Sequence, residues 1–159
     1  MTPARPEPYN RTVANLKGTY ALVVALDKDT DIDVGRLSTV SFPSGYYVYV
    51  GSALGGLLPR VRRHIAGGNR THWHIDYLRR QARVVEVWYT VSGERLECSW
   101  YEAAAKMPHA VVPVAGFGSS GCSCHSHLVH FNSMPSPEQF RRKLKVKGLD
   151  LQRMLPDEV

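Results

Sequence analysis

The chain has 159 residues and a formal net charge of +6, so we expect one domain with a buried core and an acidic partner such as nucleic acid. It holds no apolar run near the ~20 residues of a membrane span and no apolar secretory segment, so we expect neither a membrane-spanning nor a secreted protein. Its three cysteines are too few for a disulfide framework, which favours a protein of the reducing cytoplasm.

The first fifty residues predict a tail and three strands. Residues 1–17 contain three prolines and no apolar period, which is typical of a tail. Residues 20–26 are continuously apolar and predict a strand that is buried on both faces. After a polar, Asp-rich turn over 27–35, two further strands are expected over 36–42 and 46–50. The short turns between the three strands predict an antiparallel meander.

Three helices and a strand are expected next. The apolar spacing predicts helices over 57–65 and 71–78, the second with Thr71 as its N-cap. Alternating apolar residues predict a strand over 84–91. A helix over 94–106 then follows. Its inner face is expected to consist of Leu96, Trp100, Ala103 and Ala104.

The last third of the chain predicts a glycine-rich loop, a strand over 127–131 and a final basic helix that begins at Ser136-Pro137. Residues 149–159 are expected to be frayed. Together the elements predict an α+β fold in which a small antiparallel central sheet, the meander plus additional strands, is flanked by helices. One domain is expected over 18–134, with 135–159 packed on it as a basic helix and tail.

Aromatic and basic side chains around a glycine-rich loop are the first candidates for a functional site. Tyr47 and Tyr49 alternate along a strand and share one face, and Tyr20 lies in the opening strand. Arg60 and His64 are four residues apart, so they share one face of the following helix. These faces would line a polar pocket. The alternative is an ordinary hairpin strand followed by a basic surface helix.

A glutamate and a group of soft ligands are further candidates. Glu97 lies beside Leu96 at the expected boundary of the core, where burying a carboxylate costs free energy unless it is paired or holds a metal. The alternative interpretation is that Glu97 is an ordinary surface or salt-bridged residue. Three residues could bind zinc, with Cys98 as a fourth ligand, although structural zinc sites usually have wider, paired Cys spacing. They are Cys122, Cys124 and His127.

Four separated motifs occur in a defined order. They are Gly18-Thr19-Tyr20, Tyr49-Val50-Gly51, Arg60-x-x-x-His64 and Glu97. This pattern resembles the GIY-YIG nuclease superfamily, with β-branched Thr19 and Val50 in place of the two isoleucines. The blocks YYVYVGSALGGL, HWHIDYL, Glu97-Cys98 and GFGSSGCSCHSHL are similar to its small Uri-type branch over about residues 18–132. This chain has Gly121 where that branch commonly has an aspartate.

The resemblance implies a metal-dependent endonuclease that hydrolyses phosphodiester bonds in DNA. DNA repair is one process in which such an enzyme would act. Glu97 would hold one Mg²⁺ or Mn²⁺, a hard cation that prefers oxygen ligands. Arg60 would hold the scissile phosphate through its planar guanidinium. Tyr20 or Tyr49 would position or deprotonate the attacking water. His64 would assist proton transfer or phosphate binding, or act as the general base in their place.

A basic and aromatic set of side chains is expected to contact the nucleic acid through its phosphates and bases. It consists of Arg62, Arg63, Arg70, Trp73, His74, Arg79 and Arg80. Two alternatives to the nuclease remain open. The first is a non-catalytic nucleic-acid-binding domain on the same scaffold, and the second is a Cys/His metal-binding interaction module.

Overall fold

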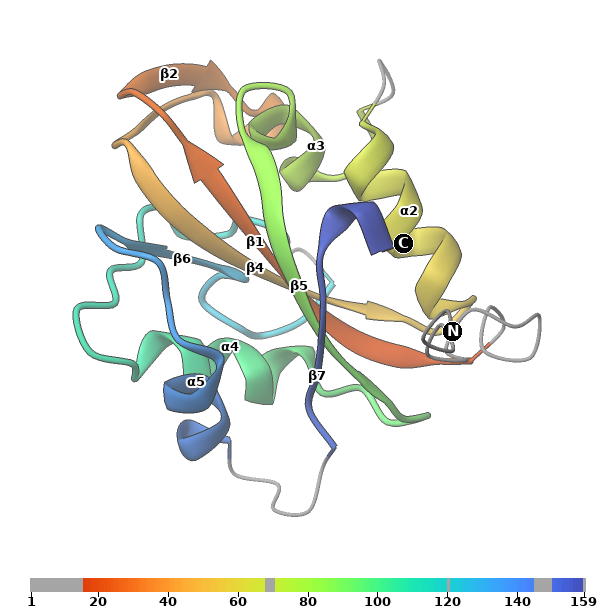
Figure 1. The fold of residues 1–159 in the computed structure, drawn as a ribbon. Helices are drawn as coiled ribbons and strands as arrows, with labels where there is room; N and C mark the ends of the chain where they lie inside the picture. Colours follow the sequence, from red (N-terminus) through yellow and green to blue (C-terminus); the bar gives the residue numbers. More distant parts are fainter. Residues whose placement is uncertain (1–15, 68–70, 120, 145–149, 159) are drawn as a thin grey trace, which may run out of the picture.

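A five-stranded antiparallel sheet forms the centre of the computed structural model, which describes residues 16–67, 71–119, 121–144 and 150–158 (Figure 1). Its strand order is β6-β4-β1-β5-β7, so β1 lies in the middle and pairs with β4 and β5. The strands are β1 (Gly18–Leu26), β4 (Gly45–Ala53), β5 (Arg83–Val91), β6 (Leu128–Phe131) and β7 (Gln152–Met154).

Helices cover both faces of this sheet (Figure 1). On one face lie α2 (Leu57–Ala66) and α3 (His74–Arg79), and on the other α4 (Glu97–Ala105) and α5 (Pro137–Lys143). Every residue of β1 is buried, because alternate side chains enter the two cores: Tyr20 packs with the first pair of helices and Ala21 with the second. The predicted α+β class and the doubly buried opening strand are therefore confirmed.

The predicted three-strand meander is wrong in one respect. The segment expected as its second strand forms β3 (Thr39–Phe42), which pairs with β2 (Thr30–Asp33) in a separate two-stranded sheet. The chain between the two strands contains a 3₁₀ helix at Gly35–Leu37. β2 was missed because its Asp-rich sequence is typical of a turn, yet Ile32 alternates with exposed neighbours and is buried. The hairpin thus connects two strands, β1 and β4, that pair directly.

Parts of the segment 150–158 form regular structure where frayed residues were expected. Within the described part, β7 pairs with the edge of β5, and a 3₁₀ helix follows at Pro156–Glu158. Met154 is buried, and Arg153 forms an ion pair with the buried Glu86. A strand of three residues has too little sequence pattern to be predicted, because its hydrogen bonds come from the edge of β5.

Helix positions largely follow the predictions. α2 matches its predicted range, and α5 begins at Pro137 after Ser136, whose hydroxyl accepts a hydrogen bond from the backbone N–H of Gln139 at 3.3 Å. α4 begins at Glu97 rather than at residue 94, which places that carboxylate in the first turn. Within the described ranges, no helix has the length and apolar character that crossing a membrane requires.

Candidate active site

A polar cavity of about 300 Å³ lies where the end of β4 meets the beginnings of α2 and α4. Four of the five residues predicted to be catalytic line it: Tyr20 from β1, Tyr49 from β4, Arg60 from α2 and Glu97 from α4. The other lining residues are Gly51, Ser52, Leu54, Gly55, Trp73, Arg95, Gly118 and His127. Side chains from segments far apart in the sequence are therefore brought into one cavity.

Two glycines make room for the two tyrosines of the cavity. Gly51 faces Tyr20 in the β1–β4 register, and a Cβ at Gly51 would lie 2.6 Å from the Tyr20 hydroxyl oxygen. A Cβ at Gly118 would lie 2.8 Å from the Tyr49 ring, and Gly118 also has a φ of 70°, which favours glycine. The glycine of the Tyr49-Val50-Gly51 motif is thus required by the position of Tyr20.

His64, the fifth predicted residue, lies behind Tyr20 and does not line the cavity. It is only 1% exposed, and its Nε2 forms a 2.8 Å hydrogen bond with the Tyr20 hydroxyl. Burial lowers the pKa of His64 to about 4 and raises the pKa of Tyr20 to about 12. Burial also raises the pKa of Tyr49 well above its usual value. At neutral pH, all three side chains are therefore uncharged.

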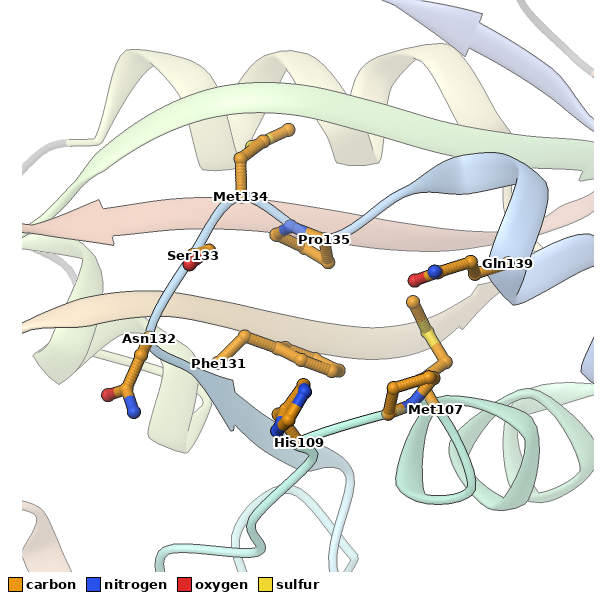
Figure 2. Close-up of a pocket in the computed structure, with 9 residues that line it drawn as sticks. Met107, His109, Phe131, Asn132, Ser133, Met134, Pro135 and Gln139 are labelled. Atoms are coloured by element: carbon orange, nitrogen blue, oxygen red, sulfur yellow. The ribbon is translucent and has the colours of Figure 1, made fainter.

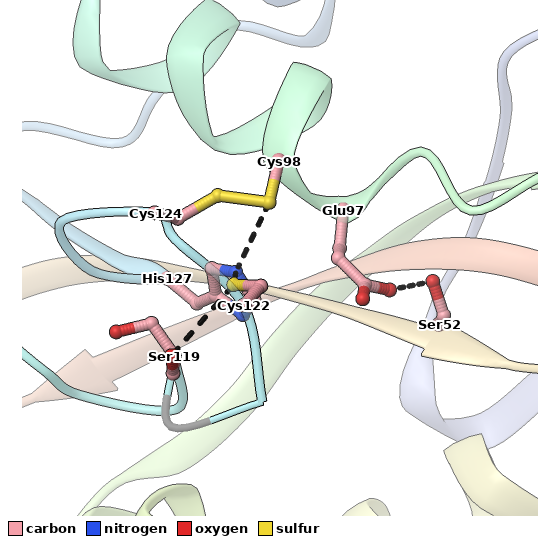
Figure 3. The surroundings of a disulfide bond; sticks show 7 residues. All are labelled: Ser52, Glu97, Cys98, Ser119, Cys122, Cys124 and His127. Carbon is pink, nitrogen blue, oxygen red and sulfur yellow. Dashed lines mark hydrogen bonds between the residues drawn. A yellow bond between two sulfur atoms is a disulfide. The ribbon is translucent and has the colours of Figure 1, made fainter.

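Glu97 reaches the cavity from the first turn of α4, where the positive end of the helix dipole favours a carboxylate. Its Oε2 accepts a hydrogen bond from the Ser52 hydroxyl (Figure 3). The carbonyl oxygen of Ser52 accepts a 3.4 Å hydrogen bond from Nη1 of Arg60. Ser52, which was not predicted as a site residue, therefore connects the carboxylate to the arginine.

Arg60 is held against the ring of Trp73. Its guanidinium carbon lies 4.4 Å from the ring centroid, and that of Arg63 lies 4.2 Å from it. Such cation–π contacts restrain the direction of a long side chain. Arg63 also forms a 3.1 Å ion pair with Asp76. Trp73 therefore contacts two guanidinium groups and the edge of the core, which limits the ring surface available to a base.

Asp76 organises the start of α3. Its Oδ2 accepts hydrogen bonds from the backbone N–H groups of His72 at 2.8 Å and Trp73 at 2.9 Å. Burial opposes ionisation, but these bonds and Arg63 hold the pKa of Asp76 below its usual value. The helix begins at His74 rather than after the predicted cap Thr71. Asp76 therefore fixes the loop that carries Trp73 to the cavity.

The residues predicted to contact nucleic acid have different environments. Arg62 and Arg80 are exposed, whereas Arg70 lies outside the described residues. Arg79 donates hydrogen bonds to the carbonyls of His64, Ile65 and Ala82 at 2.8, 2.6 and 2.8 Å. Nδ1 of His74 accepts a 2.9 Å bond from the Gly118 N–H. Arg79 and His74 therefore tie neighbouring segments of the protein together.

The predicted soft-ligand group also comes together, directly beside Glu97 (Figure 3). The ligand atoms of Cys98, Cys122, Cys124 and His127 all lie within 4.8 Å of one another, so this group could bind a metal. Cys98 and Cys124 form a disulfide, which was not expected from the cysteine count. Cys122 is a free thiol, with its Sγ 3.3 Å from Nε2 of His127.

A larger cavity of about 410 Å³ lies beside the core formed with α4 and α5, to which its lining residues Met107 and Phe131 belong (Figure 2). Met107, Phe131, Met134 and Pro135 give it a mainly apolar wall, with His109 at one side. Among its described lining residues none is acidic, and none was predicted as a site residue. The polar cavity around Glu97 is therefore the better candidate for an active site.

A family model described as a domain of unknown function, DUF123, matches residues 19–148. The match covers most of the chain, so the chain belongs to this family. No curated protein and no solved structure matches the chain at a significant level. Because the family description assigns no activity, the chemistry of the cavity is the basis for a functional proposal.

Proposed function

We propose that this protein is a metal-dependent endonuclease of the GIY-YIG type, close to the Uri-type branch, that hydrolyses phosphodiester bonds in DNA. The observation that carries the proposal is the meeting of Tyr20, Tyr49, Arg60 and Glu97 in one polar cavity. The sequence motifs predict these four residues, which come from four different elements. Their chemical types match the needs of phosphoryl transfer: a metal ligand, a phosphate-binding cation and groups that orient water.

The residues at the cavity fit a single Mg²⁺ or Mn²⁺. A hard cation prefers oxygen ligands, and Mg²⁺ usually keeps several waters while it is held by one or two carboxylates. Glu97 offers its carboxylate at the cavity wall, and the hydrogen bond from Ser52 orients it. When bound, such an ion would polarise a phosphoryl oxygen and neutralise developing charge.

Arg60 is suited to hold the scissile phosphate. Its guanidinium can donate two parallel hydrogen bonds to phosphate oxygens, which a lysine cannot do. Its contacts with Trp73 and with the Ser52 carbonyl restrict its orientation before a substrate enters. This preorganisation lowers the entropy that is lost when the phosphate binds.

Tyr20 and Tyr49 are suited to orient the attacking water through their phenol oxygens. Neither is ionised at neutral pH, because burial raises the pKa of Tyr20 to about 12 and raises the pKa of Tyr49 well above its usual value. The charge of Arg60 opposes this rise at Tyr20 and would stabilise a phenolate as it forms. His64 is a positioning residue, since its neutral imidazole fixes the Tyr20 hydroxyl from behind.

A non-catalytic nucleic-acid-binding domain is the alternative. Exposed Arg62 lies on α2, the helix that carries Arg60, and exposed Arg80 lies at the end of α3. They would contact phosphates in either case, with affinity that falls as salt rises. In a domain that only binds nucleic acid, however, a carboxylate beside Arg60 would weaken binding, because Glu97 would repel the phosphate. The nuclease gives Glu97 a role.

The test is a cleavage assay on duplex, single-stranded and branched DNA with Mg²⁺ or Mn²⁺. We expect the wild type to nick or cut at least one of these substrates, and we expect Glu97→Ala and Arg60→Ala to lose at least about 100-fold in rate. Glu94→Ala is the matched control, since Glu94 is exposed outside the cavity and should cut as the wild type does. An inactive wild type, or variants as active as the wild type, would overturn the proposal.

A further inference from the structure

We propose that Cys98, Cys122, Cys124 and His127 form a tetrahedral Zn²⁺ site when the Cys98–Cys124 disulfide is reduced. This site is separate from the oxygen-ligand site proposed at Glu97, and its evidence does not depend on nuclease activity. Three thiolates and one imidazole are a donor set of structural zinc sites, in which all four positions are filled by protein.

The geometry of the four side chains supports a shared ion (Figure 3). In a tetrahedral site with Zn–S distances of about 2.3 Å, the ligand atoms are roughly 3.4–3.8 Å apart. The four ligand atoms here already lie within 4.8 Å of one another. Nε2 of His127 is 3.3 Å from Sγ of Cys122 and 4.0 Å from Sγ of Cys98. The imidazole therefore faces the sulfur atoms, and small side-chain movements would bring all four to an ion.

A disulfide alone does not account for this arrangement. The Cys98–Cys124 bond needs two cysteines, yet Cys122 and His127 converge on the same point. The position of His127 is fixed by its backbone, which donates to the Phe117 carbonyl at 2.8 Å and accepts from the Val50 N–H at 3.0 Å. A third thiol and an imidazole beside the disulfide supply the two further ligands that a four-ligand metal site requires.

Formation of the site is a balanced two-step reaction. A dithiol gives two electrons and two protons to the Cys98–Cys124 bond, which becomes two thiols while the dithiol becomes a cyclic disulfide. Zn²⁺ then displaces the protons of the three thiols and binds the neutral imidazole of His127. The three cysteines are partly exposed, so both the reductant and the ion can reach them.

The site would fasten the glycine-rich loop to the start of α4. Cys98 follows Glu97 directly, and both His127 and Gly118 line the cavity. A zinc ion shared by Cys98 and the loop would therefore hold Glu97 at a fixed distance from the loop. We expect zinc to stabilise the domain against heat, because an ion that binds only the folded state shifts the equilibrium towards it.

The test measures metal binding directly. The full chain is reduced with a dithiol under anaerobic conditions, incubated with Zn²⁺ alone, desalted and analysed for zinc per chain. In a second sample Co²⁺ replaces Zn²⁺, because the visible spectrum of Co²⁺ reports tetrahedral thiolate ligation. We expect one zinc per chain, a tetrahedral Co²⁺ spectrum and a Tm above that of the reduced protein without metal. Cys122→Ser keeps both disulfide cysteines but should weaken zinc binding at least about 10–100-fold, the loss typical of removing even an outer-shell partner.

Ser123→Ala is the matched control, because this exposed neighbour in the same loop is no ligand and should leave zinc binding unchanged. The proposal is overturned if the reduced wild type retains no stoichiometric zinc. It is also overturned if reduced Cys122→Ser binds zinc as tightly as the reduced wild type, because Cys122 would then not be a ligand.

Discussion

Gly51 offers a direct test of how the two tyrosine motifs depend on each other. A Cβ at this position would lie 2.6 Å from the Tyr20 hydroxyl oxygen, whereas ordinary contact begins at 3.4 Å. In Gly51→Ala the oxygen must therefore move by the difference, about 0.8 Å, inside a core where Tyr20 is 1% exposed. We expect overpacking to cost about 1–3 kcal/mol of unfolding free energy. The same displacement disturbs the 2.8 Å bond to His64.

Thermal unfolding and the cleavage rate together measure this effect. For a domain of this size Tm should fall by roughly 2–4 °C per kcal/mol. Cleavage should fall by about 100-fold, as expected for a misplacement near 1 Å at an active site. Gly93→Ala is the control, since a Cβ there meets nothing within 4 Å and Gly93 does not line the cavity, and it should behave as the wild type. If Gly51→Ala matched Gly93→Ala in both measurements, the inferred packing of Tyr20 on Gly51 would be refuted.

Three further predictions concern stability and binding. Arg79→Ala should lower the unfolding free energy by about 2–3 kcal/mol, because its hydrogen bonds to three carbonyls are lost. Arg62→Ala, at an exposed position, should change Tm little and instead reduce the salt slope of DNA binding by about one. Equal Tm values for the two variants would contradict this expectation. Asp76→Asn should cost about 1–2 kcal/mol at pH 7, because the carboxylate accepts four hydrogen bonds. Since the folded pKa of Asp76 is lowered, chemical denaturation should show this difference between variant and wild type closing only as pH falls below about 4. The unfolded chain takes up the His64 proton near pH 6.5, whereas the folded chain does so only near pH 4. The unfolding free energy of the wild type should therefore fall by about 3 kcal/mol from pH 7 to pH 4 through this residue. An equally steep fall of the unfolding free energy in His64→Gln would contradict this expectation.

Local patterns predicted the elements that carry the site. The continuous apolar run of β1 and the four-residue spacing of Arg60 and His64 are properties of single segments, and α2 and β1 are where they were expected. The order of the motifs then identified Tyr20, Tyr49 and Glu97 as partners, and the structure places them around one cavity.

Contacts between distant segments could not be predicted in the same way. The bond between Ser52 and Glu97 joins residues 45 positions apart, and it forms only because α4 begins beside the end of β4. The shared face of Arg60 and His64 also did not reveal that His64 is buried behind Tyr20. The Cys98–Cys124 pairing likewise depends on where the loop meets α4, which no local spacing specifies.

The most direct test of the proposed nuclease separates binding from chemistry in Glu97→Gln. This change removes the negative charge but keeps the shape of the side chain. Its effect is measured on one DNA substrate, as Kd without divalent metal and as cleavage rate with Mg²⁺. We predict that the variant binds at least as tightly as the wild type, because a charge that repels phosphate is gone, and that cleavage falls by at least about 100-fold. Cleavage by Glu97→Gln at the wild-type rate would contradict the account, as would a wild type that binds this DNA and never cuts it.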